Sequence, residues 1–173
     1  MSLMMKVTAA ASILFAAVLG GCGGKSFKAL DMSVGPPAGT ATSSTTYKVD
    51  IVGVSDADAK EIEGVNPAEW FASSGPGAQK RAKFRSATRS LEIRAGTGVQ
   101  AVKPSDPIWS TWRASHVTKL KVIVDPPPGT MPDPSTWTRD VTPMSQTYEN
   151  DEIKVWVDTG GVRLDRSPLP EKS

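Results

Sequence analysis

Residues 119–129 read KLKVIVDPPPG and join an apolar, β-branched run to an abrupt stop. β-Branched side chains in such a run are typical of a strand within a β-sheet. The prolines and glycine at 126–129 cannot continue it, because proline lacks the backbone N–H that a sheet ladder requires. The segment therefore predicts a β-strand over 120–124 that ends before Pro126.

Short segments on either side of this stretch also predict strands, from alternation of apolar and other residues or from β-branched composition. They are 47–54, 91–94, 136–141, 153–157 and 162–164. Thr159, Gly160 and Gly161 separate the last two segments, which predicts a terminal hairpin.

Two segments predict short helices in the connections. Residues 66–71 begin with Asn66 and Pro67, and residues 106–113 begin with Asp106 and Pro107, so each has a capping residue followed by proline at the first helical position. The 15 glycines and 14 prolines suit an all-β protein with many turns. We therefore expect a mainly β fold, a small β-sandwich with two short helices over residues 47–165, followed by an exposed tail at 166–173.

The composition excludes several classes of function. A net charge of +2 is too small to indicate a nucleic-acid partner. The single cysteine excludes an internal disulfide and a cysteine-rich metal site, and the single histidine excludes a multi-histidine zinc site. We expect no cofactor and no metal.

The N-terminal 22 residues predict export and lipid attachment. Residues 7–19 are mostly apolar and uncharged, follow Lys6, and lead into Leu19-Gly20-Gly21-Cys22, which is the layout of a signal peptide over 1–21. The apolar run of 13 residues spans about 20 Å, short of the roughly 30 Å hydrocarbon core. The pattern at 19–22 resembles the lipobox of bacterial lipoproteins, which implies cleavage between Gly21 and Cys22 and acylation of the Cys22 thiol. The alternative is an ordinary signal peptide in which the cysteine is incidental.

The following residues predict a tether. Residues 22–46 are expected to be the acylated cysteine and a linker rich in glycine, serine, threonine, alanine and proline. Such a coil has a root-mean-square span of about 25–30 Å. The alternative is that residues 27–34 pack as an N-terminal strand or helix. Gly23 stands where such lipoproteins commonly carry an aspartate for inner-membrane retention, so the resemblance favours the outer membrane.

Three arginines form the candidate binding site. Arg81, Arg85 and Arg89 are spaced four residues apart, and residues 75–91 contain no acid. On a helix they would share one face, with Phe84 beside it. Such a face would contact anionic headgroups or an acidic partner. The alternative is a solvated face balanced by acids such as Asp56, Asp58, Glu61 and Glu63.

The tryptophans allow a second function. Trp70, Trp109, Trp112, Trp137 and Trp156 are many for a chain of 173 residues. If exposed, they would make this a glycan- or cell-wall-binding lipoprotein; otherwise they fill the core. Trp156 alternates with two valines and is expected on the opposite face of its strand from them.

Catalysis is not expected. His116 follows Ser115, but no G-x-S-x-G elbow accompanies them. The acidic loop after the first strand lacks the spacing of a calcium site. The chain is therefore interpreted as a non-enzyme.

The layout resembles the type VI secretion outer-membrane lipoprotein family (SciN/TssJ-like). This resemblance rests on the lipobox at 19–22, the first strand at 47–54 and the C-terminal run. In that run, residues 119–125 are followed by Trp137-Thr138-Arg139 and then by the two short strands at 153–157 and 162–164. The resemblance implies a transthyretin-like sandwich whose loops grip the periplasmic part of an inner-membrane partner. We therefore expect an envelope protein, anchored in the outer membrane through lipid on Cys22 and facing the periplasm, whose non-catalytic domain binds another envelope protein.

Overall fold

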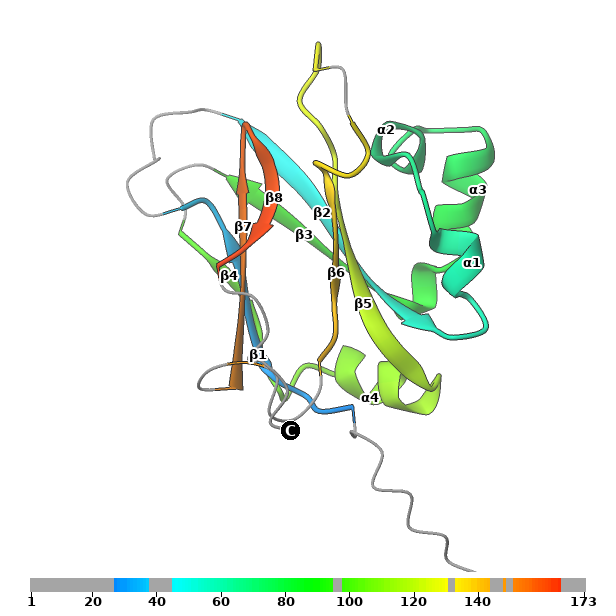
Figure 1. Ribbon diagram of the computed structural model, residues 1–173, viewed down its shortest axis with the longest axis vertical. Helices are drawn as coiled ribbons and strands as arrows, with labels where there is room; N and C mark the ends of the chain where they lie inside the picture. Colours follow the sequence, from blue (N-terminus) through cyan, green and yellow to red (C-terminus); the bar gives the residue numbers. More distant parts are fainter. Residues whose placement is uncertain are drawn as a thin grey trace, which may run out of the picture.

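A computed structural model describes residues 27–37, 45–94, 98–130, 133–143, 148 and 151–165. Two four-stranded sheets make up the fold (Figure 1). The first sheet has the order β4 (Gln100–Val102), β1 (Asp31–Gly35), β7 (Glu152–Asp158), β8 (Gly161–Leu164). The second has the order β3 (Thr88–Arg94), β2 (Thr46–Ser55), β5 (Val117–Val124), β6 (Thr138–Val141). The prediction of a mainly β sandwich is confirmed.

Each predicted strand is present, with bounds that differ by a few residues at most. β7 and β8 form the expected antiparallel hairpin, in which Asp158 lies opposite Gly161. The second sheet is antiparallel throughout, whereas β1 and β7 of the first sheet run parallel. Alternation predicted these strands because one face of each is buried in the sandwich.

The first strand of the fold lies inside the segment expected to be linker. β1 pairs with β7 from Asp31 to Gly35, and its other edge pairs with β4. The side chains of Met32 and Val34 are buried in the core. The expected linker at 22–46 is therefore wrong over β1, and the alternative, a packed N-terminal strand, describes these residues. The apolar burial of this short strand outweighs a composition that is typical of a linker.

The main core lies between the two sheets. β7 illustrates its origin: Ile153, Val155 and Val157 are fully buried, and the residues between them are more exposed. Trp156 is half-buried on the opposite face from the two valines, as predicted.

Four short α-helices and a 3-10 turn accompany the sheets. They are α1 (Ala59–Ile62), α2 (Pro67–Trp70), α3 (Pro76–Lys83), η1 (Arg85–Ala87) and α4 (Ile108–Ala114). The predicted helices correspond to α2 and α4. The Asn66 side chain caps α2, since its Oδ1 accepts from the N–H of Ala68 at 3.0 Å. α1 and α3 were not predicted, and their short length gives little periodic signal.

The helices between β2 and β3 cover the outer face of the second sheet (Figure 1). A second apolar cluster fills this layer: Val52, Val54, Ile62, Val65, Trp70, Phe84 and Ile123. The strands of this sheet are therefore buried on both faces near their centre, which places the polar side chains found there in a dry environment.

α4 closes one end of the sandwich through Trp112. A Cβ added at Gly53 would lie 2.3 Å from Trp112 Cδ1, so only glycine allows the indole this close to β2. The indole Nε1 donates to the Ala87 carbonyl at 2.7 Å. In the described ranges no helix is long and apolar enough to cross a bilayer. Gly21, Cys22 and the tail at 166–173 lie outside the described residues.

Candidate functional site

A pocket of about 700 Å³ opens on the helical layer beside β3. Its walls come from the segment after α2, from one side of α3 and from the start of β3. Asp50, Phe71, Ala72, Ser73, Ala78, Arg81, Ala82, Arg85, Thr88, Arg89 and Ser90 line it. All three arginines that the sequence singled out are among these residues. The structure therefore gathers them at one site.

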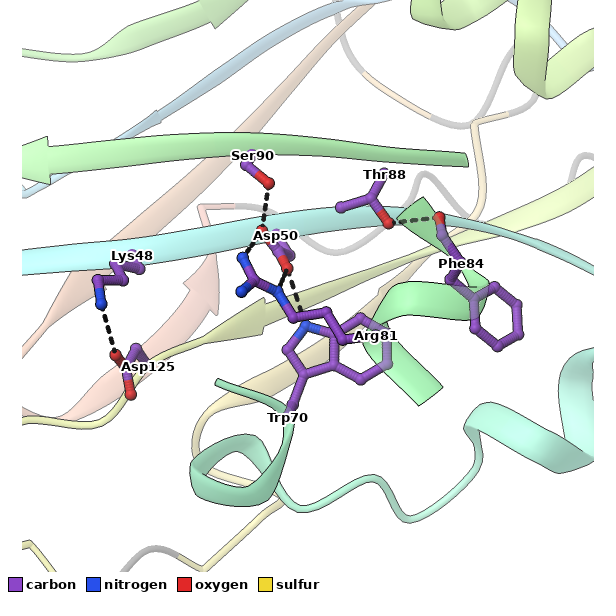
Figure 2. A network of polar contacts seen from close by, with 8 residues as sticks. All are labelled: Lys48, Asp50, Trp70, Arg81, Phe84, Thr88, Ser90 and Asp125. Atoms are coloured by element: carbon purple, nitrogen blue, oxygen red, sulfur yellow. Dashed lines mark hydrogen bonds and ion pairs between the residues drawn. The ribbon is translucent and has the colours of Figure 1, made fainter. Parts of the chain in front are cut away.

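A buried carboxylate forms the floor of the pocket. The Asp50 residue is 1% exposed and lies in the middle of β2. Its Oδ2 accepts from Trp70 Nε1 at 2.8 Å and from Arg81 Nε at 2.7 Å, and its Oδ1 accepts from Ser90 Oγ at 2.6 Å. Figure 2 shows these donors converging on Asp50 from α2, α3 and β3. Because the network joins three elements to β2, it fixes the helical layer on the sheet.

Arg81 also builds one wall. Its guanidinium lies 4.8 Å from the centre of the Phe71 ring. This cation–π contact holds Phe71 at the pocket, where it adds an apolar surface beside the charges. Arg81 is therefore committed to Asp50 and Phe71.

The other two arginines differ in their partners. Arg89 Nε lies 3.3 Å from Asp106 Oδ2, so an acid compensates its charge. Arg85 is exposed, and within the described residues it has no ion-pair partner. Arg85 is therefore the cation of this pocket that is available to a ligand.

The arginines do not share a helix face, and that expectation is wrong. α3 ends at Lys83, Arg85 lies in η1 and Arg89 lies in β3. Beyond α3, Thr88 Oγ1 donates to the Phe84 carbonyl at 2.8 Å, and the chain becomes extended at Thr88. Phe84 is buried in the second apolar cluster. The arginines meet because the turn between α3 and β3 folds the chain around the pocket.

Three of the four acids proposed to balance the arginines have other partners. Glu61 pairs with Lys83. Asp58 accepts from Ser55 Oγ at 2.6 Å, and Asp56 accepts from Thr118 Oγ1 at 2.7 Å. No group of three or more His, Cys, Asp or Glu side chains within the described residues is arranged to hold a metal ion.

Asp50 and Phe71 were not predicted as site residues. A signal for Asp50 existed, since one acid stands among the apolar residues of 47–54. An acid in a strand that is otherwise suited to burial implies a buried partner. Phe71 gave no comparable signal.

The indoles do not form the exposed platform that glycan binding would need. Trp70, Trp109, Trp112 and Trp137 are buried, with exposures of 3% or less. Only Trp156 is half-exposed. His116 lies on the surface in a turn with φ of 52°.

Comparison with solved structures places the fold beside proteins of the type VI secretion system. A chain in a structure described as a type VI membrane complex aligns with a TM-score of 0.51 and 15% identity, covering 78% of this chain and 95% of that chain. A structure described as the T6SS protein TssM C-terminal domain (869–1107) from EAEC aligns with a TM-score of 0.50 and 15% identity, covering 78% of this chain and 98% of the other.

A lower score of 0.44, at 8% identity, relates this chain to the T6SS lipoprotein TssJ1 from Pseudomonas aeruginosa, covering 83% of this chain and 98% of that one. Nothing about this chain follows from a likeness at that level. No family model matches the chain. A search of curated proteins finds no match either. At these identities the two higher-scoring alignments establish the similarity of the fold alone, over 78% of this chain and nearly the whole length of the two other chains.

Proposed function

We propose that this chain is a lipid-anchored, non-enzymatic protein of the bacterial envelope that binds a partner protein within a type VI secretion-like membrane complex. The arginine pocket receives an acidic segment of that partner, and Arg85 supplies the recognising charge. Lipid on Cys22 attaches the protein to the outer membrane, with the sandwich in the periplasm.

The pocket carries this proposal. It holds an exposed arginine, Arg85, that has no ion-pair partner in the described residues, and its lining also includes the ring of Phe71, which lies against Arg81. A guanidinium can bind a carboxylate through two parallel hydrogen bonds, which favours Arg85 over a lysine for this task. The fold similarity to chains of type VI secretion structures and the lipobox-like residues at 19–22 support the envelope setting.

Co-purification from envelopes tests the proposal. The protein carries a C-terminal affinity tag and is expressed in a cell that holds a type VI membrane complex, and bound proteins are identified by mass spectrometry. Arg85→Glu reverses the free charge of the pocket. Lys60→Glu is the matched control, because Lys60 is exposed on α1 and also has no ion-pair partner in the described residues. Lys60 lies outside the pocket.

We expect the wild type and Lys60→Glu to retain a type VI membrane component, and Arg85→Glu to lose about tenfold or more of it, since replacing attraction by like-charge repulsion costs more than about 1.4 kcal/mol. Absence of any such component from the acylated wild type contradicts the assignment to this complex. Equal retention by both variants contradicts the role of Arg85.

Radiolabelled palmitate tests the anchor separately. The label should appear on the wild type and be lost in Cys22→Ser, which should leave the membrane fraction. An unlabelled wild type contradicts the lipid anchor whatever the outcome of the co-purification.

A further inference from the structure

The chain is packed against the sandwich from Phe27 onward. The Phe27 ring lies 5.8 Å from the Trp109 ring of α4, at an interplanar angle of 53°. The next residue, Lys28, donates its backbone N–H to the Pro143 carbonyl at 3.1 Å. Its side chain forms an ion pair with Asp151. Three separate contacts therefore hold the start of the described chain at the end of the sandwich that α4 closes.

The position of Phe27 limits the reach of a lipid on Cys22. Five peptide units separate the two residues, and a chain spans at most about 3.6 Å per residue, so their Cα atoms lie no more than about 18 Å apart. The described fold starts at Phe27, so the tether is shorter than the 25–30 Å coil expected for a linker over 22–46. A domain of this size is about 35 Å across. Because this limit is shorter than the domain, the end of the sandwich opposite Phe27 cannot reach the bilayer when Cys22 carries the lipid.

The end that faces the bilayer can be identified in Figure 1. The blue segment that leads into β1 lies beside α4, and the β7–β8 turn and the loop between β5 and β6 lie at the other end. The ring contact between Phe27 and Trp109 independently places the chain start at α4.

The surface around α4 suits lipid headgroups. Ser105, Ser110, Arg113, Ser115 and His116 are exposed there. The one acid in residues 103–116 is Asp106, whose side chain is 17% exposed and pairs with Arg89. Other carboxylates at this end also have partners: Asp31 pairs with Lys103, Asp151 pairs with Lys28, and Asp56 accepts from Thr118 Oγ1. Arg113, which has no ion-pair partner in the described residues, and the hydroxyl groups can therefore donate hydrogen bonds to lipid phosphates.

We propose that the α4 end of the sandwich lies against the lipid headgroups, held there by a tether of five residues. This proposal rests on the lipid anchor of the proposed function and adds its geometry. It directs the β7–β8 turn and the β5–β6 loop away from the membrane, where a partner protein can reach them.

Paramagnetic relaxation in nanodiscs tests this orientation. The mature chain 22–173 is coupled through Cys22, its only cysteine, to a maleimide-bearing lipid. The nanodiscs contain phosphatidylethanolamine, phosphatidylglycerol and a lipid with a gadolinium-chelating headgroup. Amide relaxation is compared between 108–116 and the turn at 159–160. In the control variant about 20 glycine and serine residues are inserted between Gly24 and Lys25, which adds a coil span of about 25 Å.

We expect the paramagnetic rate at 108–116 to exceed that at 159–160 by about tenfold or more, because the two ends differ in distance from the bilayer by up to about 35 Å. The inserted coil should bring the two rates within about threefold, since it removes the limit on rotation. Similar rates at both ends with the native tether would overturn the proposal. A difference that survives the insertion would overturn the role of the tether.

Chemical coupling keeps this test independent of processing in the cell. If cellular palmitate labelling fails, the proposed anchor fails whatever the nanodiscs show. If labelling succeeds and the native tether gives similar rates at both ends, only the orientation fails.

Discussion

Replacing Asp50 by alanine should destabilise the fold strongly, because Asp50 joins three elements to β2. Its side chain is 1% exposed, and the variant leaves the buried Trp70 Nε1–H without its acceptor. An orphaned buried donor costs about 1–3 kcal/mol. The lost pair with Arg81 adds less than a fully buried pair would, since the Arg81 side chain is 38% exposed and water can replace the carboxylate. We expect a loss of about 3 kcal/mol in the free energy of unfolding.

Urea unfolding followed by tryptophan fluorescence measures this loss. Asp50→Asn should lose less, about 1–2 kcal/mol, because its amide oxygen can still accept from Trp70. Glu92→Ala is the matched control: its carboxylate is 62% exposed and pairs with Arg94 on the surface of β3. The control should change stability by less than about 1 kcal/mol. If Asp50→Ala is no less stable than Glu92→Ala, with an unchanged denaturant slope, the network does not hold the helical layer on the sheet.

Three further changes have defined outcomes. Gly53→Ala should lose about 1–3 kcal/mol in urea unfolding, because its Cβ would lie 2.3 Å from Trp112 Cδ1. Burial, and secondarily the Asp158 carboxylate, raises the pKa of Tyr47. The folded state therefore stays protonated to a higher pH than the unfolded state, and stability falls as pH rises above about 10. The urea midpoint should drop less between about pH 9 and 11 in Tyr47→Phe than in the wild type. Burial also raises the pKa of Asp125, with smaller effects of nearby charges. The wild type should gain stability relative to Asp125→Asn as pH falls from about 7 toward 4, and a constant difference would contradict this.

Local patterns predicted most strands because each has one buried face. They offered a strand near β1 only as an alternative to a linker, and they did not predict its parallel pairing with β7, in which Asp31 lies opposite Glu152, 121 positions later in the chain. The composition of the segment around β1 resembles a linker, and its burial is supplied by strands distant in sequence. Local periodicity contains no information about such a partner.

The candidate site illustrates the same limit. The four-residue spacing drew attention to Arg81, Arg85 and Arg89, and all three line the pocket, although the helix that would have aligned them ends at Lys83. Their meeting depends on the turn into β3. Asp50, which binds Arg81, lies 31 positions earlier, so the pairing could not be derived from the arginine segment alone.

The partners of the three arginines limit the kinds of ligand that would suit the pocket. Asp50 compensates Arg81 and Asp106 compensates Arg89, so Arg85 is the lining cation without a compensating acid in the described residues. Phe71 adds an apolar surface to the same pocket. A polyanion would gain little from one uncompensated charge, whereas a carboxylate next to an apolar side chain would match both features. The pocket therefore suits a short acidic and apolar segment of a protein better than nucleic acid, in agreement with a net charge of only +2 over the whole chain.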